Sequence, residues 1–206
     1  MKILLHACCG PCTIYPLYRL RSEGHNVTGF FYNPNIHPFR EFRKRINTFS
    51  DFSKTNQLPV FLDNKYGLKS FVRSIAFHED QRCKFCYTMR LTEVVLFAAK
   101  MGFDSFTTTL LYSKYQHHET IRMICERLSS RFQISFHYED YREGWQFGVD
   151  QSVTLDMYRQ PYCGCIFSEH ERYDKSYRKM KFASKSSQDS GYTYALNAGN
   201  SNNKRK

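Results

Sequence analysis

The chain has 206 residues, the length of one ordinary domain, and it can bury a core without disulfides. Hydrophobic residues make up 41% and charged residues 24%, which excludes a wholly disordered chain and a fibrous repeat. No apolar run approaches the roughly 18 to 20 residues of a membrane span. The apolar stretch before His6 is too short for a signal peptide. We therefore expect a cytoplasmic protein without a membrane partner.

The chain is strongly basic. It has 30 lysine and arginine residues against 19 aspartate and glutamate residues, a formal net charge of +11. A charge of this size favours a polyanionic partner such as a nucleic acid. Residues 182–206 are rich in Ser, Asn, Gly and Lys and offer little to bury, so we predict a disordered polar and basic tail. Residues 1–181 are predicted to form a single domain.

Short apolar runs alternate along the chain with longer segments whose apolar residues recur every three or four positions. In order, we predict a strand at 2–6, a helix at 11–24, a strand at 27–32, a helix at 39–52, a strand at 58–62, helices at 68–75 and 83–101, a strand at 105–111, a helix at 121–128 and a strand at 133–138. The alternation indicates an α/β fold, with an open, mainly parallel, Rossmann-like sheet of about five strands. Residues 139–181 are predicted to be helical and irregular.

Seven of the eight cysteines fall into three tight motifs. The first cysteine motif is Cys8, Cys9 and Cys12, the second is Cys83 and Cys86, and the third is Cys163 and Cys165. In a cytosolic domain of this size, such motifs indicate metal or redox chemistry rather than a disulfide framework. The eighth cysteine, Cys125, lies in an apolar helical pattern and is predicted to be a buried core thiol.

The first motif directly follows the first predicted strand, where a nucleotide-binding sheet would carry its phosphate loop. A cysteine-rich turn offers sulfur ligands instead of glycine amides, so it favours zinc or an iron–sulfur cluster. The second motif is much too far along the chain for a zinc ribbon, whose pairs lie about 15 to 20 residues apart. The two motifs together also carry more thiols than a tetrahedral zinc requires, although a structural metal remains an alternative.

The third motif has a single glycine between its two thiols. A disulfide across that spacing is strained, and strained disulfides are the redox-active kind. We favour a redox pair over a second set of metal ligands. Arg40, Arg43, Lys44 and Arg45 form a basic stretch that could follow a phosphate backbone or be an ordinary solvated face. Tyr158 and Arg159 lead into the third motif and are predicted to orient a substrate.

Four segments resemble the QueH-type epoxyqueuosine reductases. They are ILLHACCGPC at 3–12, RCKFCYTMRL at 82–91, FTTTLL at 106–111 and YRQPYCGCIFSE at 158–169. The resemblance extends in order over about residues 2–175 and includes all three cysteine motifs. It implies an adenine-nucleotide-hydrolase-like fold and the last step of queuosine biosynthesis. In that step, epoxyqueuosine at the wobble position of tRNA is reduced to queuosine.

The resemblance also implies a cobalamin-independent oxidoreductase with a 4Fe-4S cluster. Its ligands would be Cys8, Cys9, Cys83 and Cys86, with Cys163 and Cys165 as the redox-active pair and Cys12 as a ligand of an additional iron ion. Our own candidates for substrate binding, taken from the residues and not from the resemblance, are Arg40, Arg43, Tyr158 and Arg159. The partners would be tRNA containing epoxyqueuosine and an unidentified electron donor. The alternatives are a metal-stabilised tRNA-binding protein and a thiol–disulfide oxidoreductase.

Overall fold

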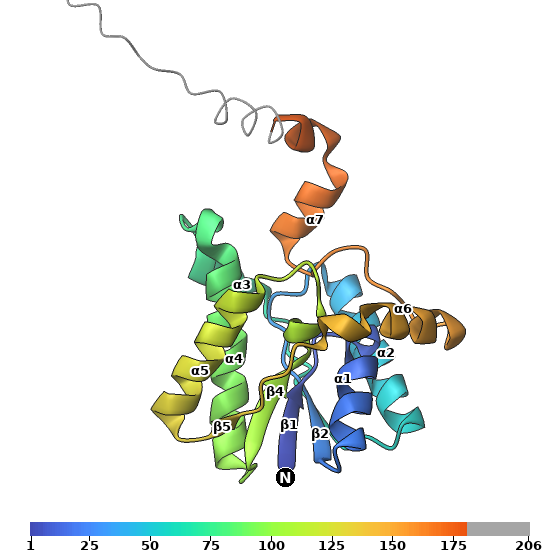
Figure 1. The fold of residues 1–206 in the computed structure, drawn as a ribbon. Helices are drawn as coiled ribbons and strands as arrows, with labels where there is room; N and C mark the ends of the chain where they lie inside the picture. The colour runs from blue at the N-terminus through green and yellow to red at the C-terminus, as the bar shows by residue number, and fades with distance from the viewer. Residues whose placement is uncertain (181–206) are drawn as a thin grey trace, which may run out of the picture. The chain divides into compact units, whose positions relative to one another are not determined.

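Five parallel strands form one sheet in the order β3-β2-β1-β4-β5 (Figure 1). The structure is a computed structural model that describes residues 1–180, so the predicted tail, 182–206, lies outside the described residues. The strands are β1 (Lys2–His6), β2 (Asn26–Phe31), β3 (Val60–Leu62), β4 (Ser105–Thr108) and β5 (Ser135–Phe136). The predicted α/β fold with an open parallel sheet is confirmed.

Helices cover both faces of the sheet. They are α1 (Gly10–Ser22), α2 (Phe39–Thr55), α3 (Leu68–Ile75), α4 (Arg82–Lys100), α5 (His118–Phe132), α6 (Trp145–Thr154) and α7 (Ile166–Tyr173), with short 3-10 turns η1 (Glu79–Gln81), η2 (Thr109–Tyr112) and η3 (Tyr141–Gly144). Figure 1 shows α1 and α2 on one face and α4 and α5 on the other. No helix among the described residues is both long enough and apolar enough to cross a membrane.

The central strand β1 is buried on both faces, which is why it reads as a continuous apolar run. Leu4 packs into the cluster that contains Leu91 of α4, whereas Ile3 and Leu5 pack into the cluster that contains Phe49 of α2. Phe42, Phe49 and Phe52 of α2 belong to the core cluster on one face of the sheet, as their spacing predicts, whereas Phe39 at the start of the helix is exposed. In such a sheet, the loops that form a functional site lie at the carboxyl ends of the strands.

Two strands are shorter than predicted. The run predicted as strand 105–111 leaves the sheet after Thr108, because the Thr108 hydroxyl accepts a hydrogen bond from the Leu110 backbone N–H at 3.2 Å and the chain continues as η2. The strand predicted at 133–138 pairs only through Ser135–Phe136. Its first residue, Gln133, has a φ of 52° and ends α5 in a left-handed conformation.

The described chain divides into two units after Ile166, and each is considered by itself. The first unit, residues 1–166, contains the whole sheet and all eight cysteines. The described part of the second unit is α7 and a further helical stretch over residues 175–180, and His170 Nε2 of α7 lies 3.0 Å from Asp174 Oδ2 between them. The single domain expected at 1–181 stays a prediction.

Candidate metal centre

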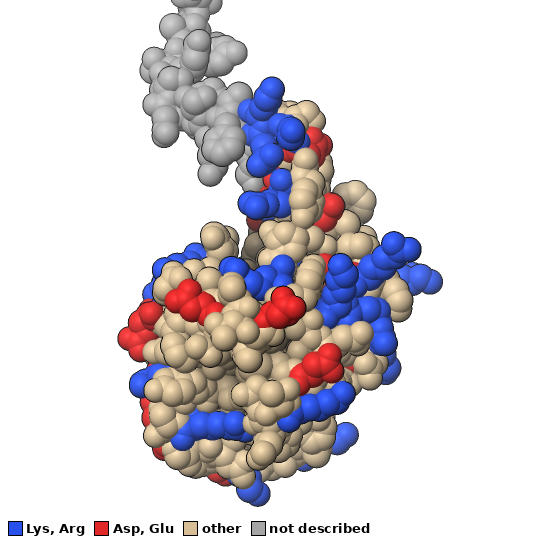
Figure 2. Space-filling view, turned by 90° about the vertical axis from the view of Figure 1, so that its right-hand side faces the viewer, with Lys and Arg blue, Asp and Glu red and all other residues tan. Residues whose placement is uncertain are grey.

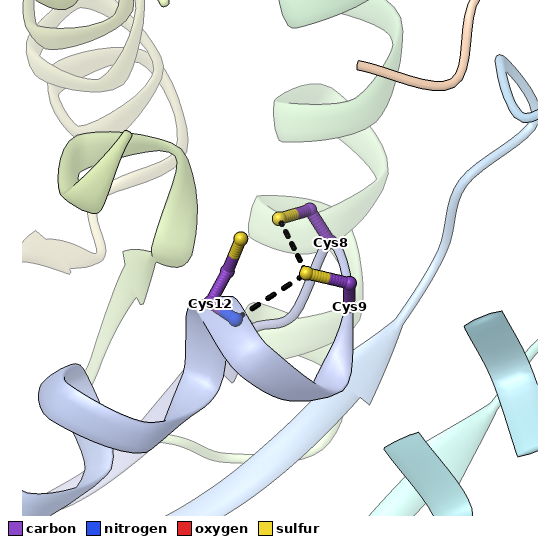
Figure 3. Close-up of side chains that lie close together, drawn as sticks. All are labelled: Cys8, Cys9 and Cys12. Carbon is purple, nitrogen blue, oxygen red and sulfur yellow. Dashed lines mark hydrogen bonds between the residues drawn. The ribbon is translucent and has the colours of Figure 1, made fainter. Parts of the chain in front are cut away.

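The first cysteine motif lies at the carboxyl end of β1, where the connections from β1 and β4 leave on opposite faces of the sheet. The sulfur atoms of Cys8, Cys9 and Cys12 all lie within 4.8 Å of one another (Figure 3). Cys8 Sγ and Cys9 Sγ are 3.8 Å apart. Cys9 and Cys12 are buried and Cys8 is half-buried. Three soft donors this close together can bind a metal ion.

Local hydrogen bonds explain why this turn holds its sulfurs together. Cys9 is the N-cap residue of α1, and its Sγ accepts the backbone N–H of Cys12 at 3.3 Å. The Thr13 hydroxyl donates to the Cys9 carbonyl at 2.7 Å. On the other side, the Cys8 N–H donates to Thr109 Oγ1 at 3.0 Å, which ties the turn to the end of β4. The turn is therefore fixed on both sides.

The three thiols have different pKa values because they contact one another. Hydrogen bonds with Cys12 and Cys9 hold the pKa of Cys8 well below its usual range. Burial raises the pKa of Cys9, and hydrogen bonds with Cys8 and Cys9 raise the pKa of Cys12. Cys8 is thus the most acidic thiol of the three. A metal that recruits the other two sulfurs must displace their protons.

The second cysteine motif lies in the first turn of α4 and reaches the first motif through Arg90. Arg90 Nη1 lies 3.9 Å from Cys86 Sγ, and Arg90 Nη2 donates to Asn33 Oδ1 at 2.5 Å. Asn33 Nδ2 donates in turn to the carbonyl of Ala7, the residue before Cys8. The structure therefore brings the first two motifs to the same edge of the sheet.

Arg90 is a cation buried beside these thiols, with only 3% of its surface exposed. Its hydrogen-bonding partners, an amide oxygen and a thiol, carry no full negative charge, and its Nε is buried without a hydrogen-bond partner. A buried cation needs a compensating anion. Thiolates and an anionic group held by them would supply that charge. Cys83 also packs against the apolar cluster that contains Cys9 and Cys12.

The third cysteine motif is anchored by Arg45 of α2, which is 2% exposed. Arg45 Nη1 donates to the carbonyl of Cys163 at 3.0 Å, and Nη2 donates to the carbonyl of Tyr162 at 2.9 Å. Its Nε donates to Glu41 Oε1 at 2.6 Å, so the guanidinium is paired as well as hydrogen-bonded. The segment that carries the third motif is therefore fixed to α2.

Gly164 meets two requirements of this anchor. Its φ of +116° favours glycine, and a Cβ added there would lie 2.9 Å from Arg45 Nη1. Its carbonyl accepts the His37 N–H at 2.7 Å. The glycine leaves Cys163 exposed and Cys165 buried. All eight cysteines are thiols in this structure, so the predicted redox disulfide stays a prediction.

The segment before the third motif also contacts the first. Gln160 Nε2 donates to Cys9 Sγ at 2.9 Å and lies 3.5 Å from Cys12 Sγ. Hydrogen bonds to sulfur are one means by which proteins adjust a metal–thiolate centre.

The third motif is also close to the second. The pKa of Cys86 is raised to about 12, mainly by burial; the Arg90 cation lowers it, and the nearby sulfurs of Cys163 and Cys165 contribute to the rise. Each cysteine motif is thus linked to the other two at the carboxyl edge of the sheet. From the sequence alone, this gathering of the three motifs was only a hypothesis.

The predicted substrate-binding residues lie around this edge. Arg40 and Arg43 are exposed in the first turns of α2, and Arg159 is exposed before the third motif. Tyr158 is half-buried and donates its hydroxyl proton to Glu41 Oε2 at 2.5 Å. Figure 2 looks onto the face covered by α1, α2 and α6 and shows lysine and arginine side chains gathered toward its upper right.

The sequence analysis assigned Arg45 to the wrong environment and did not identify Arg90 and Gln160 as residues of the centre. Arg45 was grouped with a solvated or phosphate-tracking basic stretch, which is wrong because it is buried and paired. Its spacing of four residues from Glu41 on one helix was the available signal. Arg90 has the same spacing from Cys86. Gln160 carries no local signal, because its contacts with sulfur depend on the tertiary fold.

A comparison with solved structures agrees with this architecture. A predicted subunit of tRNA methyltransferase from Methanocaldococcus jannaschii superposes with a TM-score of 0.54 over 74% of each chain, at 9% sequence identity. At that identity the likeness concerns the fold alone. It supports the open α/β fold expected from the sequence.

The sequence comparisons identify the family of this chain. The family model described as Epoxyqueuosine reductase QueH matches residues 3–171. The protein of that name from Dehalococcoides mccartyi is 33% identical over 174 residues, covering 84% of this chain and 96% of the relative. The one from Thermotoga maritima is 31% identical over 186 residues, covering 84% and 93%. Together with the gathered cysteine motifs, these matches show that the chain belongs to the epoxyqueuosine reductase QueH family.

Proposed function

We propose that this chain reduces epoxyqueuosine to queuosine in tRNA, the last step of queuosine biosynthesis, without cobalamin and in the cytoplasm. The observation that carries the proposal, beside membership of the family, is the gathering of three cysteine motifs at one edge of the sheet. A set of soft ligands next to an exposed thiol suits reductive chemistry on a bound substrate. Residues 1–181 would form the catalytic domain.

We assign Cys8, Cys9, Cys83 and Cys86 as the ligands of a 4Fe-4S cluster, and Cys12 as a ligand of an additional iron ion. The donor set is soft, and the buried Arg90 cation with its unpartnered Nε fits a centre that carries net negative charge. When bound, such a cluster supplies electrons one at a time. Gln160 would donate a hydrogen bond to the sulfur of Cys9.

We assign the redox role to the third cysteine motif. Conversion of an epoxide to an alkene breaks two C–O bonds, consumes two electrons and two protons, and releases water. Oxidation of the Cys163 and Cys165 dithiol to a disulfide forms one S–S bond and releases two electrons and two protons, so the two half-reactions balance. An electron donor, not yet identified, would restore the dithiol. The exposure of Cys163 and the burial of Cys165 support this role, because one thiol is open to solvent and the other lies inside the protein.

The tRNA substrate would bind across the basic edge around α2. Arg40, Arg43 and Arg159 are exposed there and can contact phosphates, and the half-buried Tyr158 adds an aromatic ring to the same region. Lys44 Nζ already lies 5.0 Å from the centroid of that ring. Anticodon-loop bases are single-stranded, and proteins commonly read such bases by splaying them onto aromatic side chains.

The test is turnover of epoxyqueuosine-containing tRNA by anaerobically reconstituted protein, with a chemical reductant, no cobalamin, and mass spectrometry of the nucleosides. We expect queuosine from the wild type and from Cys125→Ala, whose thiol is in the core, and none from Cys8→Ala. A metal-stabilised tRNA-binding protein would bind the tRNA and leave it unchanged. A thiol–disulfide oxidoreductase would reduce generic disulfides even as Cys8→Ala. Either result would overturn the proposal.

A further inference from the structure

A second group of potential metal ligands lies away from the cysteines. Glu23 and His25 stand between the end of α1 and the start of β2, and His137 directly follows β5. The ligand atoms of these three side chains all lie within 4.8 Å of one another. Nothing in the proposed reaction uses them. Imidazole and carboxylate groups are the ligands of many protein-bound zinc ions.

Arg19 orients the carboxylates of this group. Its Nε donates to Glu139 Oε1 at 2.7 Å, and its Nη2 donates to Glu23 Oε1 at 3.2 Å. Each glutamate therefore uses one oxygen for the arginine and keeps the other, Oε2, for a different partner. Orientation of ligand carboxylates by a neighbouring donor is typical of metal sites.

The remaining oxygens converge on the histidine nitrogens. Glu23 Oε2 lies 3.3 Å from His25 Nε2 and 3.9 Å from His137 Nε2. Glu139 Oε2 also lies 3.9 Å from His137 Nε2, and it is buried with no hydrogen-bond partner. Neighbouring ligands of a tetrahedral zinc, with bonds of about 2.0 to 2.2 Å, stand about 3.4 Å apart. Small side-chain shifts would therefore bring these atoms to coordinating distance.

The surroundings favour a metal ion over a set of ion pairs. The side chains of His25, His137 and Glu139 are only 14%, 17% and 16% exposed. Two glutamates and one arginine leave a net negative charge, which a divalent cation would offset.

We propose that Glu23, His25, His137 and Glu139 form a binding site for one Zn²⁺ ion, separate from the thiol centre. Four protein ligands complete a tetrahedral shell and leave no position for a reacting water, so the ion is structural. It fixes the start of β2 to the segment that follows β5. That segment continues into η3, where Glu143 accepts a hydrogen bond from the Tyr15 hydroxyl of α1 at 2.7 Å.

The test uses the full chain with its thiol centre loaded. The protein is equilibrated with Zn²⁺, freed of loosely held metal, and analysed for zinc and iron together, with X-ray absorption at the zinc edge. We expect one zinc per chain with only nitrogen and oxygen neighbours at about 2.0 to 2.2 Å, and no sulfur at about 2.3 Å. In His137→Gln, zinc affinity falls at least tenfold, while iron content and tRNA turnover stay unchanged.

The matched control is His170→Gln, which removes a histidine that pairs with one carboxylate and belongs to no three-ligand group within residues 1–180. This variant should retain the zinc. Glu139→Gln, which preserves side-chain size, should weaken zinc binding at least tenfold and serves if His137→Gln fails to fold. Zinc with sulfur neighbours only, or zinc bound equally by wild type and Glu139→Gln, would overturn the proposal.

Discussion

Replacement of Arg45 by methionine should loosen the third cysteine motif and destabilise the protein. Arg45 is 2% exposed and lies 2.6 Å from Glu41, which is 7% exposed. Removal of one partner of a buried ion pair costs about 3 to 5 kcal/mol, because the other charge is left uncompensated. The Tyr158 hydroxyl still donates to Glu41, so the lower end of that range, about 3 kcal/mol, is expected.

The assay is urea unfolding of the full chain under anaerobic conditions, together with the rate at which Cys163 reacts with a thiol reagent. That rate should rise in Arg45→Met, because the carbonyls of Tyr162 and Cys163 lose their donors. The double variant Arg45→Met/Glu41→Gln removes the stranded charge and should regain about 1 kcal/mol or more. The exposed neighbour Arg43→Met should stay within about 0.5 kcal/mol of wild type. An Arg45→Met variant as stable as the wild type, or a double variant no better than the single, would refute the reasoning.

Three further predictions concern the same edge of the sheet. Gly164→Ala should cost about 1 to 3 kcal/mol in urea unfolding, because its positive φ and the nearby guanidinium disfavour a Cβ; stability equal to wild type would contradict this. Arg40→Gln/Arg43→Gln should weaken tRNA binding, and the slope of the logarithm of the binding constant against the logarithm of the salt concentration should fall by about one per lost phosphate contact. The control Lys100→Gln should leave that slope unchanged. An unchanged slope in the double variant would mean that the tRNA binds elsewhere. Gln160→Leu should lower the midpoint potential of the loaded centre in a spectroelectrochemical titration, because a hydrogen bond to sulfur is lost; an unchanged potential would argue against that contact.

The sheet could be predicted because its strands are marked by burial. The run Ile3 to Leu5 is apolar without interruption, as expected for a strand covered on both faces, and α2 repeats its phenylalanines with helical spacing. The ends of β4 and β5 could not be predicted in the same way. Thr108 favours a strand by propensity, yet its side chain caps the turn that ends one.

The candidate site was predictable only in part, for a related reason. Cysteine motifs are local patterns, so Cys8 and Cys86 could be singled out from the sequence. The groups that hold the motifs together are contacts between distant segments. Arg90 bridges to Asn33 across the sheet, and Gln160 reaches Cys9 from the far end of the domain. The roles of these residues depend on the tertiary fold. Helical spacing in the sequence indicates only partners on the same helix, such as Arg90 and Cys86.

The account depends most on the first and second cysteine motifs holding one iron centre together. The direct measurement is iron and sulfide content, with electron paramagnetic resonance after reduction, for anaerobically purified wild type, Cys86→Ser and Cys125→Ser. Wild type and Cys125→Ser should hold about five iron atoms, about four in the cluster and one as the additional ion, and give a cluster signal. Cys86→Ser should lose the cluster iron and the signal. A Cys86→Ser protein with full iron content and an unchanged signal would show that the second motif is not part of the centre.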